Sequence, residues 1–266
     1  GNDFSFMVAT PGLPNGAGLT LPVSFNFESA PPQGFQTFQT FAVVTPPASV
    51  DPGNPHGKVY RCVDTSGGGV IGVIGDSSLG ANGNGYQVTG EIYIPGSGEP
   101  AQAIGIGICG TQGSRFFPTA SPGVSSYENG YWLIFENASG VGLNDGRPDH
   151  PGTFEFVQAV NDGNHASPTV FLGSKTLAQV GVTGGTWTTF RLAIDPNGSS
   201  GNQLIAQINN VDVYRGPIPA EGRTKGAFQI GFRENHTGAP AANEGTWIDN
   251  VTISPMNTAV SSWELY

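Results

Sequence analysis

The chain has 266 residues, of which 37% are hydrophobic and only 11% charged, and its formal net charge is −10. Its ten Lys and Arg residues are scattered singly, which argues against nucleic acid as a partner because a phosphate backbone requires a concentrated basic surface. No apolar run approaches the length of a transmembrane helix. The 41 glycines and 21 prolines favour short strands and tight turns over long helices.

Residues 1–20 are rich in Gly and Pro and contain one alternating apolar patch, from Phe4 to Val8. Such alternation indicates a strand. This strand would either lie at the edge of its own domain or be donated to a neighbouring molecule, and the sequence leaves both alternatives open.

Fourteen short segments with strand patterning follow, and turn signals such as 82–85, 95–98 and 197–198 separate nearly all of them. The predicted strands are 23–28, 38–44, 58–63, 69–74, 86–94, 103–109, 131–136, 153–160, 169–172, 187–194, 204–209, 211–214, 227–233 and 247–253. Strands of this length and spacing predict an all-β fold of two packed antiparallel sheets.

The clearest pattern lies in 187–194, where Phe190, Leu192 and Ile194 alternate with polar or small residues. A period of two is typical of a strand with one buried side. One sandwich can account for the whole chain, because sandwiches of this size fold as a single unit. We therefore expect one domain over residues 21–255, with an N-terminal tail or edge strand at 1–20 and a C-terminal tail at 256–266.

Several short motifs carry a resemblance to a known superfamily. They are Gly185-Thr-Trp187 before the alternating strand, the Asp195-Pro-Asn-Gly198 turn, the hairpin that ends in Val213-Tyr214, and the closing Gly245-Thr-Trp-Ile-Asp249-Asn-Val251. With these motifs the chain resembles the concanavalin A-like/laminin-G-like jelly-roll superfamily over roughly residues 20–255. The resemblance implies a jelly-roll sandwich that is secreted and faces sugars, without fixing a chemistry, since the superfamily includes carbohydrate-binding modules, lectins, glycoside hydrolases, polysaccharide lyases and adhesion domains.

The side chains that alternate with the apolar set predict a ligand-binding face. They are Glu91, Tyr93, Trp187, Arg191, Gln207, Gln229 and Arg233. An aromatic platform with amide, guanidinium and carboxylate groups suits a sugar chain, and Gly105 and Gly107 would add a strip without side chains. The alternative is a solvated face that binds nothing.

The resemblance also implies a structural calcium ion that ties the first strand to the last. Glu28 and Asp249 are the carboxylates that would hold it, because calcium prefers several oxygen ligands. In the alternative, both carboxylates cap turns or face water.

The two cysteines, Cys62 and Cys109, are compatible either with one disulfide between neighbouring strands or with two buried thiols. A low Lys content and four glycosylation sequons favour an extracellular or cell-surface location. The sequons are at Asn137, Asn197, Asn235 and Asn250.

Evidence for catalysis is weak. The paired-carboxylate run of retaining glycosidases in this superfamily is missing, and the Gln207-Ile-Asn209 segment has Asn where alginate-lyase-like members have a His base. The four histidines, His56, His150, His165 and His236, all fall in predicted loops. We therefore expect a non-catalytic domain that binds polysaccharide or surface glycan. The alternatives are a structural subunit of an extracellular fibre, sheath or surface layer that assembles through its tails, and a polysaccharide lyase or glycoside hydrolase.

Overall fold

The computed structural model describes residues 21–28, 35–37, 40–63, 70–74, 79–80, 83–110, 130–139, 149–159, 169–197, 202–220, 222–234 and 239–256. This part of the chain contains fifteen strands and one short 3-10 helix, joined by turns and loops. In chain order the elements are β1 (Val23–Phe25), β2 (Phe35–Thr37), β3 (Thr40–Val44), β4 (Val59–Val63), β5 (Val70–Ile74), β6 (Tyr86–Ile94), β7 (Gln102–Gly110), β8 (Gly130–Glu136), β9 (Thr153–Ala159), β10 (Thr169–Thr176), η1 (Ala178–Val180), β11 (Thr186–Asp195), β12 (Gln203–Ile208), β13 (Val211–Gly216), β14 (Ala227–Glu234) and β15 (Thr246–Pro255).

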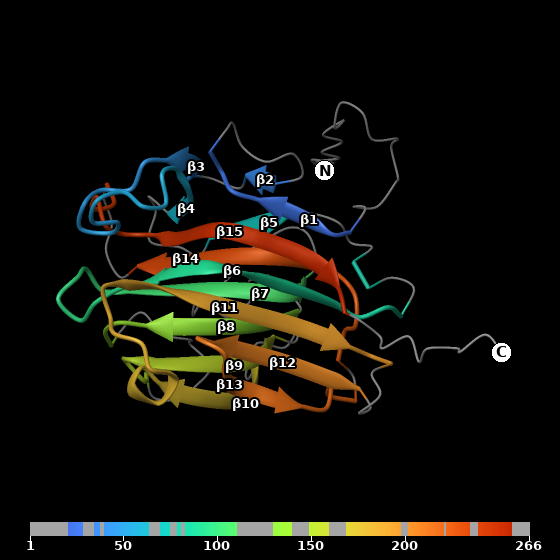
Figure 1. The fold of residues 1–266 in the computed structure, drawn as a ribbon. Coiled ribbons are helices and arrows are strands. Elements are labelled where there is room, and N and C mark those ends of the chain that lie inside the picture. The colour runs from blue at the N-terminus through green and yellow to red at the C-terminus, as the bar shows by residue number, and fades with distance from the viewer. Residues whose placement is uncertain are drawn as a thin grey trace, which may run out of the picture.

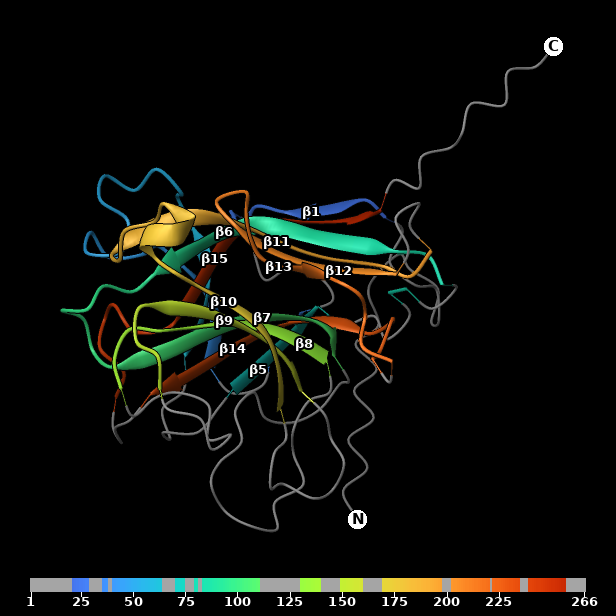
Figure 2. The same cartoon turned by 90° about the horizontal axis from the view of Figure 1, so that it is seen from below.

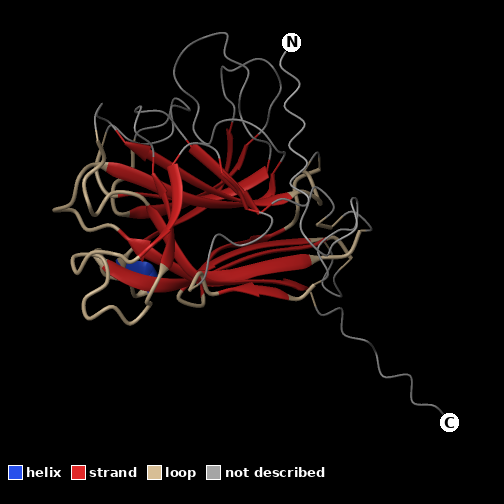
Figure 3. Ribbon diagram, turned by 90° about the horizontal axis from the view of Figure 1, so that it is seen from above, coloured by secondary structure: helices blue, strands red, loops and turns tan. Residues whose placement is uncertain are grey.

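These strands form two antiparallel sheets that pack face to face (Figures 1 and 2). Sheet A has the order β13-β12-β11-β6-β15-β4-β3, with β1 paired to β15, and sheet B has the order β10-β9-β8-β7-β14-β5-β2. Figure 2 shows the sheets as two layers, and Figure 3 shows how little of the described chain is helical. The predicted all-β sandwich is confirmed.

Alternation of side chains places the hydrophobic core between the sheets. The sets Ile104/Ile106/Ile108 on β7 and Phe190/Leu192/Ile194 on β11 all belong to one buried cluster, as predicted. A directional contact across the two layers is the stacked pair of Phe190 and Phe228, whose ring centroids are 6.3 Å apart. The interior is therefore specified by the strand pattern itself.

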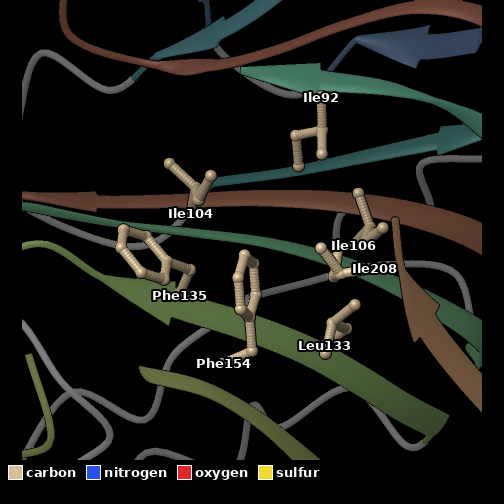
Figure 4. Close-up of a pocket in the computed structure, with 7 residues that line it drawn as sticks. All are labelled: Ile92, Ile104, Ile106, Leu133, Phe135, Phe154 and Ile208. Atoms are coloured by element: carbon tan, nitrogen blue, oxygen red, sulfur yellow. The ribbon is translucent and has the colours of Figure 1, made fainter. Parts of the chain in front are cut away.

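A small apolar cavity lies within this interior (Figure 4). Its lining comes from both sheets and consists of Ile92, Ile104, Ile106, Leu133, Phe135, Phe154 and Ile208. A cavity without polar groups cannot satisfy the hydroxyls of a sugar, so it is an imperfection of core packing and not a ligand site.

All fourteen predicted strands are present, with differences at their ends. The predicted strand 23–28 stops at Phe25, because Phe27 adopts a left-handed backbone with φ of 54° that cannot continue a strand. β2 was not predicted, since three residues are too few to show a period. The β12–β13 hairpin turns through Asn209 and Asn210, both with positive φ, as a two-residue type I′ turn requires.

The predicted disulfide is wrong. Cys62 and Cys109 are both free and buried. Cys62 lies on β4 of sheet A and Cys109 on β7 of sheet B, so the two strands are not neighbours. The Cys109 N–H donates to the hydroxyl of Tyr86 at 2.9 Å, and burial raises the pKa of the Cys109 thiol to about 12. Both cysteines thus act as small apolar core residues.

The described strands run from Val23 to Pro255, inside the predicted domain. The predicted N-terminal tail at 1–20 lies outside the described residues, as does the predicted C-terminal tail at 256–266 apart from Met256, so the proposed division into domain and tails stays a prediction. Among the described residues, no helix is long and apolar enough to cross a membrane.

Gly90 on β6 provides a test of the inter-sheet packing. A Cβ at this position would lie 2.9 Å from the Phe190 ring and 3.1 Å from the carbonyl oxygen of Asp249. We expect Gly90→Ala to lower the free energy of unfolding by about 1–3 kcal/mol, because the core has to expand. Gly98→Ala is the control, since nothing lies within 4 Å of its Cβ, and it should change stability by less than about 0.5 kcal/mol. Urea unfolding of both variants measures the difference, and equal stabilities would contradict the packing described.

Candidate functional site

Five of the seven residues predicted to bind a ligand lie on sheet A. They are Glu91 and Tyr93 on β6, Trp187 and Arg191 on β11, and Gln207 on β12. Cross-strand partners point to the same side of a sheet. Because Trp187 is paired with Tyr93, and Arg191 with Gln207, these side chains share the outer face of sheet A.

The other two predicted residues lie on the opposite sheet, which corrects the prediction of one continuous patch. Gln229 and Arg233 are on β14, in the middle of sheet B. Gln229 is 0% exposed, and its side chain occupies the space above Gly110. Alternation assigns a residue to the inside or the outside of a strand, but it does not say which sheet the strand joins.

The predicted glycine strip on sheet B is also not open. A Cβ at Gly107 would lie 2.7 Å from the indole ring of Trp132, which packs flat against this glycine. Trp132 is buried in a small apolar cluster with Ile134 and Val157. Gly107 therefore makes room for the buried side chain of Trp132 and not for a ligand.

The connection between β3 and β4 folds over the outer face of sheet A. Val50 from this connection packs with Tyr93 and Trp247 in a second small apolar cluster. The Trp187 indole N–H donates to the Val50 carbonyl at 2.9 Å, and its ring stacks on the imidazole of His56 with centroids 4.2 Å apart. Trp187 therefore holds the connection in place and does not present a free platform to a sugar.

Tyr93 also has a structural role and is not available to a ligand. It is 1% exposed, and its hydroxyl donates to the carboxylate of Glu99. Of the seven predicted residues, Glu91, Arg191 and Gln207 thus remain half-buried and accessible on one face.

A carboxylate sets the orientation of His56. Asp51 accepts a hydrogen bond from the His56 backbone N–H at 3.1 Å and contacts the ring Nδ1 at 2.8 Å. A carboxylate can only accept, so Nδ1 donates this hydrogen bond and the ring directs Nε2 away from Asp51. Nε2 lies 3.9 Å from the Oε2 of Glu91.

Asp249 completes this group from β15. Ligand atoms of His56, Glu91 and Asp249 all lie within 4.8 Å of one another, so these residues can hold a metal ion. The pairing of β15 with β6 is irregular just after Asp249, and Asn250 adopts a φ of 50°. Bulges of this kind redirect side chains, and here the Asn250 amide donates to Glu91.

The carboxyl group of Asp249 lies in an unusual environment. The residue is 2% exposed, and its nearest hydrogen bond comes from the adjacent Asn250 N–H at 2.7 Å. Burial, with smaller contributions from the negative charges of Glu91 and Glu28, raises the pKa of Asp249 to about 6.

Glu28 is close to this group but is not one of its three members. Its Oε1 accepts the backbone N–H of Lys58 at 3.2 Å, so it helps to fix the end of the β3–β4 connection. The calcium site predicted from the sequence consists of Glu28 and Asp249 and does not include His56. No signal in one sequence tells which of the four loop histidines folds over a sheet.

A polar network extends from this end of sheet A along its outer face. The Arg191 Nε donates to Gln87 at 2.8 Å, and its Nη1 donates to Gln207 at 3.2 Å. Gln207 in turn donates to Asp212 at 2.7 Å, and Asp212 forms an ion pair with Arg215. The network spans four adjacent strands and fixes the Arg191 guanidinium and two amides on three of them, which provides oriented donors and acceptors on a half-exposed surface.

No protein-family model and no curated protein matches the chain. Among solved structures, the carbohydrate recognition domain of Emp46p in its metal-free form matches with a TM-score of 0.52 at 13% identity, over 86% of this chain and 94% of that one. The potassium-bound form of the same domain matches with a TM-score of 0.50 at 14% identity, over the same shares. Lectin II from Ulex europaeus matches with a TM-score of 0.50 at 11% identity, over 88% of this chain and 98% of that one.

At these identities the similarity establishes the architecture. At the level of the fold the predicted resemblance is confirmed, because this chain shares a two-sheet architecture with these lectin domains.

Proposed function

We propose that this chain is a non-catalytic glycan-binding domain that binds a polysaccharide or surface glycan along the outer face of sheet A. The observation that carries the proposal is the network of Arg191 with Gln87 and Gln207. Sugars present pairs of hydroxyls, and planar guanidinium and amide groups bind such pairs when their orientation is already fixed. The lectin-like fold supports a carbohydrate ligand over other small molecules.

An extracellular or cell-surface location is part of this proposal. The low Lys content and the exposed sequon residue Asn197 support it, whereas the Asn250 amide is engaged by Glu91. The sequon at Asn137 offers no support, because this residue is only 6% exposed. The sequon at Asn235 lies outside the described residues.

The buried carboxylate at the end of this face also supports a functional site. Asp249 is buried beside Glu91 without a Lys or Arg partner in the described part of the chain, an arrangement that costs stability. Costly charges of this kind cluster at functional sites.

A polysaccharide lyase or hydrolase is the second candidate. The observation that favours it is the Asp51–His56 pair, which directs the second imidazole nitrogen toward two carboxylates. The structural-subunit alternative depends on the tails, which lie outside the described residues, and it stays a prediction.

Replacing Arg191 tests the proposed face. We expect Arg191→Ala to weaken glycan binding at least tenfold, because one charged donor and the orientation of both amides are lost together. Lys175→Ala on β10 of sheet B removes the same charge from the other sheet and should leave binding unchanged. A glycan array followed by affinity electrophoresis measures the effect. The proposal fails if no polysaccharide retards the native protein, or if both variants bind equally well.

The second candidate makes a separate prediction. Incubation of the protein with uronate-containing and neutral polysaccharides should release no new reducing ends and produce no absorbance from 4,5-unsaturated products. Activity that disappears in His56→Ala would instead establish the enzyme and displace the non-catalytic proposal.

The raised pKa of Asp249 predicts how stability depends on pH. In the folded protein this carboxyl holds its proton up to about pH 6, while in the unfolded chain it ionises near 3.8. The contribution of Asp249 to stability is therefore highest below that lower value and falls as the pH rises towards 6. At pH 7.5, in EDTA, Asp249→Asn should be more stable than the native protein by about 1–2 kcal/mol, since solvent around the site screens part of the full shift. At pH 3.5 the two should be equally stable.

Asp212→Asn is the control with the opposite sign. Its hydrogen bond with Arg215 lowers the pKa of Asp212, so this carboxylate stabilises the fold at neutral pH and loses that effect as the pH falls. Urea denaturation of both variants at the two pH values measures these differences. A destabilised Asp249→Asn at pH 7.5 would contradict the electrostatic account of the site.

A further inference from the structure

We propose that His56, Glu91 and Asp249 bind one divalent transition-metal ion of the zinc class, in place of the calcium ion that the sequence suggested. This inference goes beyond glycan binding, because the ion would bind whether or not a sugar is present. It rests on the positions of three side chains, the orientation of one ring, and the charge of the group.

The three donors come from three separate segments of the chain. His56 comes from the β3–β4 connection, Glu91 from β6 and Asp249 from β15, and their ligand atoms lie within 4.8 Å of one another. Ligands about 2.1 Å from a zinc ion are at most about 4 Å apart, so a small inward movement is needed. Glu91 can supply it, since its side chain is 33% exposed and would give up only the hydrogen bond from the Asn250 amide.

The imidazole is held in the orientation that a metal ligand needs. The Nδ1–H donates to the carboxylate of Asp51, which is buried, at 2.8 Å, and the Trp187 ring stacks on the imidazole. Metal-binding histidines use this arrangement, in which a carboxylate fixes the tautomer and directs the other nitrogen at the ion. Nε2 accordingly lies on the side of Glu91.

The charge of the group calls for a cation. Two carboxylates face one imidazole, and in the described part of the chain neither Glu91 nor Asp249 forms an ion pair with Lys or Arg. Asp249 is 2% exposed, so water cannot fully solvate its charge. A bound divalent ion would neutralise both carboxylates at once.

The donor types select the class of ion. Calcium prefers six to eight oxygen ligands, and an imidazole nitrogen is a poor substitute for one of them. Zinc and its neighbours bind imidazole together with carboxylates, and three protein ligands leave a position for water or another oxygen. At this site the open position would lie on the side of Glu91, whose side chain is half-exposed.

Direct titration of the full chain tests this site. After dialysis against EDTA, isothermal titration calorimetry with Zn²⁺ should show one ion per chain at micromolar affinity or better, and Ca²⁺ should bind at least tenfold more weakly. Co²⁺ should produce visible absorption bands, and Zn²⁺ should raise the melting temperature. No glycan is added, so failure here leaves the glycan-binding proposal standing.

Variants identify the ligands. His56→Gln and Glu91→Gln should each weaken Zn²⁺ binding at least tenfold and reduce the Co²⁺ bands. His150→Gln is the matched control, because this exposed histidine pairs with Glu155 on β9, away from the cluster, and its variant should bind Zn²⁺ normally. Glu91 is on the surface, so its variant should keep the fold even if His56→Gln does not. The site is refuted if native protein binds no Zn²⁺, if Glu91→Gln binds it normally, or if Ca²⁺ binds as tightly as Zn²⁺.

Discussion

Burial of alternate side chains between two sheets is the constraint on which the rest of this structure depends. Each long strand commits every second residue to the interior, as Phe190, Leu192 and Ile194 do on β11. The remaining side chains of that strand have to face outward. Antiparallel register then aligns them with their neighbours, so that Glu91 stands between Thr189 of β11 and Asp249 of β15. The chemistry of the outer face follows from the packing of the inner one.

The candidate site departs from this regularity at a cost. The pairing of β15 is broken after Asp249, Asn250 takes a left-handed conformation, and a carboxylate is buried next to another one. Each of these features lowers stability. The apolar cluster under the β3–β4 connection, which includes Val50 and Trp247, offsets part of that cost. The fold is thus locally less stable around Asp249, where polar groups are brought together.

Much of the fold was predictable from the sequence, because a period of two is a local property. The strands, their inward sets and the sandwich all follow from it. Which sheet a strand joins depends on contacts that are distant in sequence, and this is why Gln229 was placed beside Arg191 although β14 lies in sheet B. His56 was overlooked for the same reason, since its partners Glu91 and Asp249 are 35 and 193 residues further along the chain. A three-residue strand such as β2 has no period to detect.

Stacking of Trp187 on His56 links ligand binding by the imidazole to the position of the β3–β4 connection. The same imidazole that faces Glu91 also anchors the β3–β4 connection over Val59 and Trp247. By thermodynamic linkage, a ligand that prefers the anchored imidazole must also favour the closed connection, and opening of the connection must weaken that ligand. Binding of such a ligand at His56 and closure of the β3–β4 connection over the apolar cluster beside it would therefore increase or decrease together.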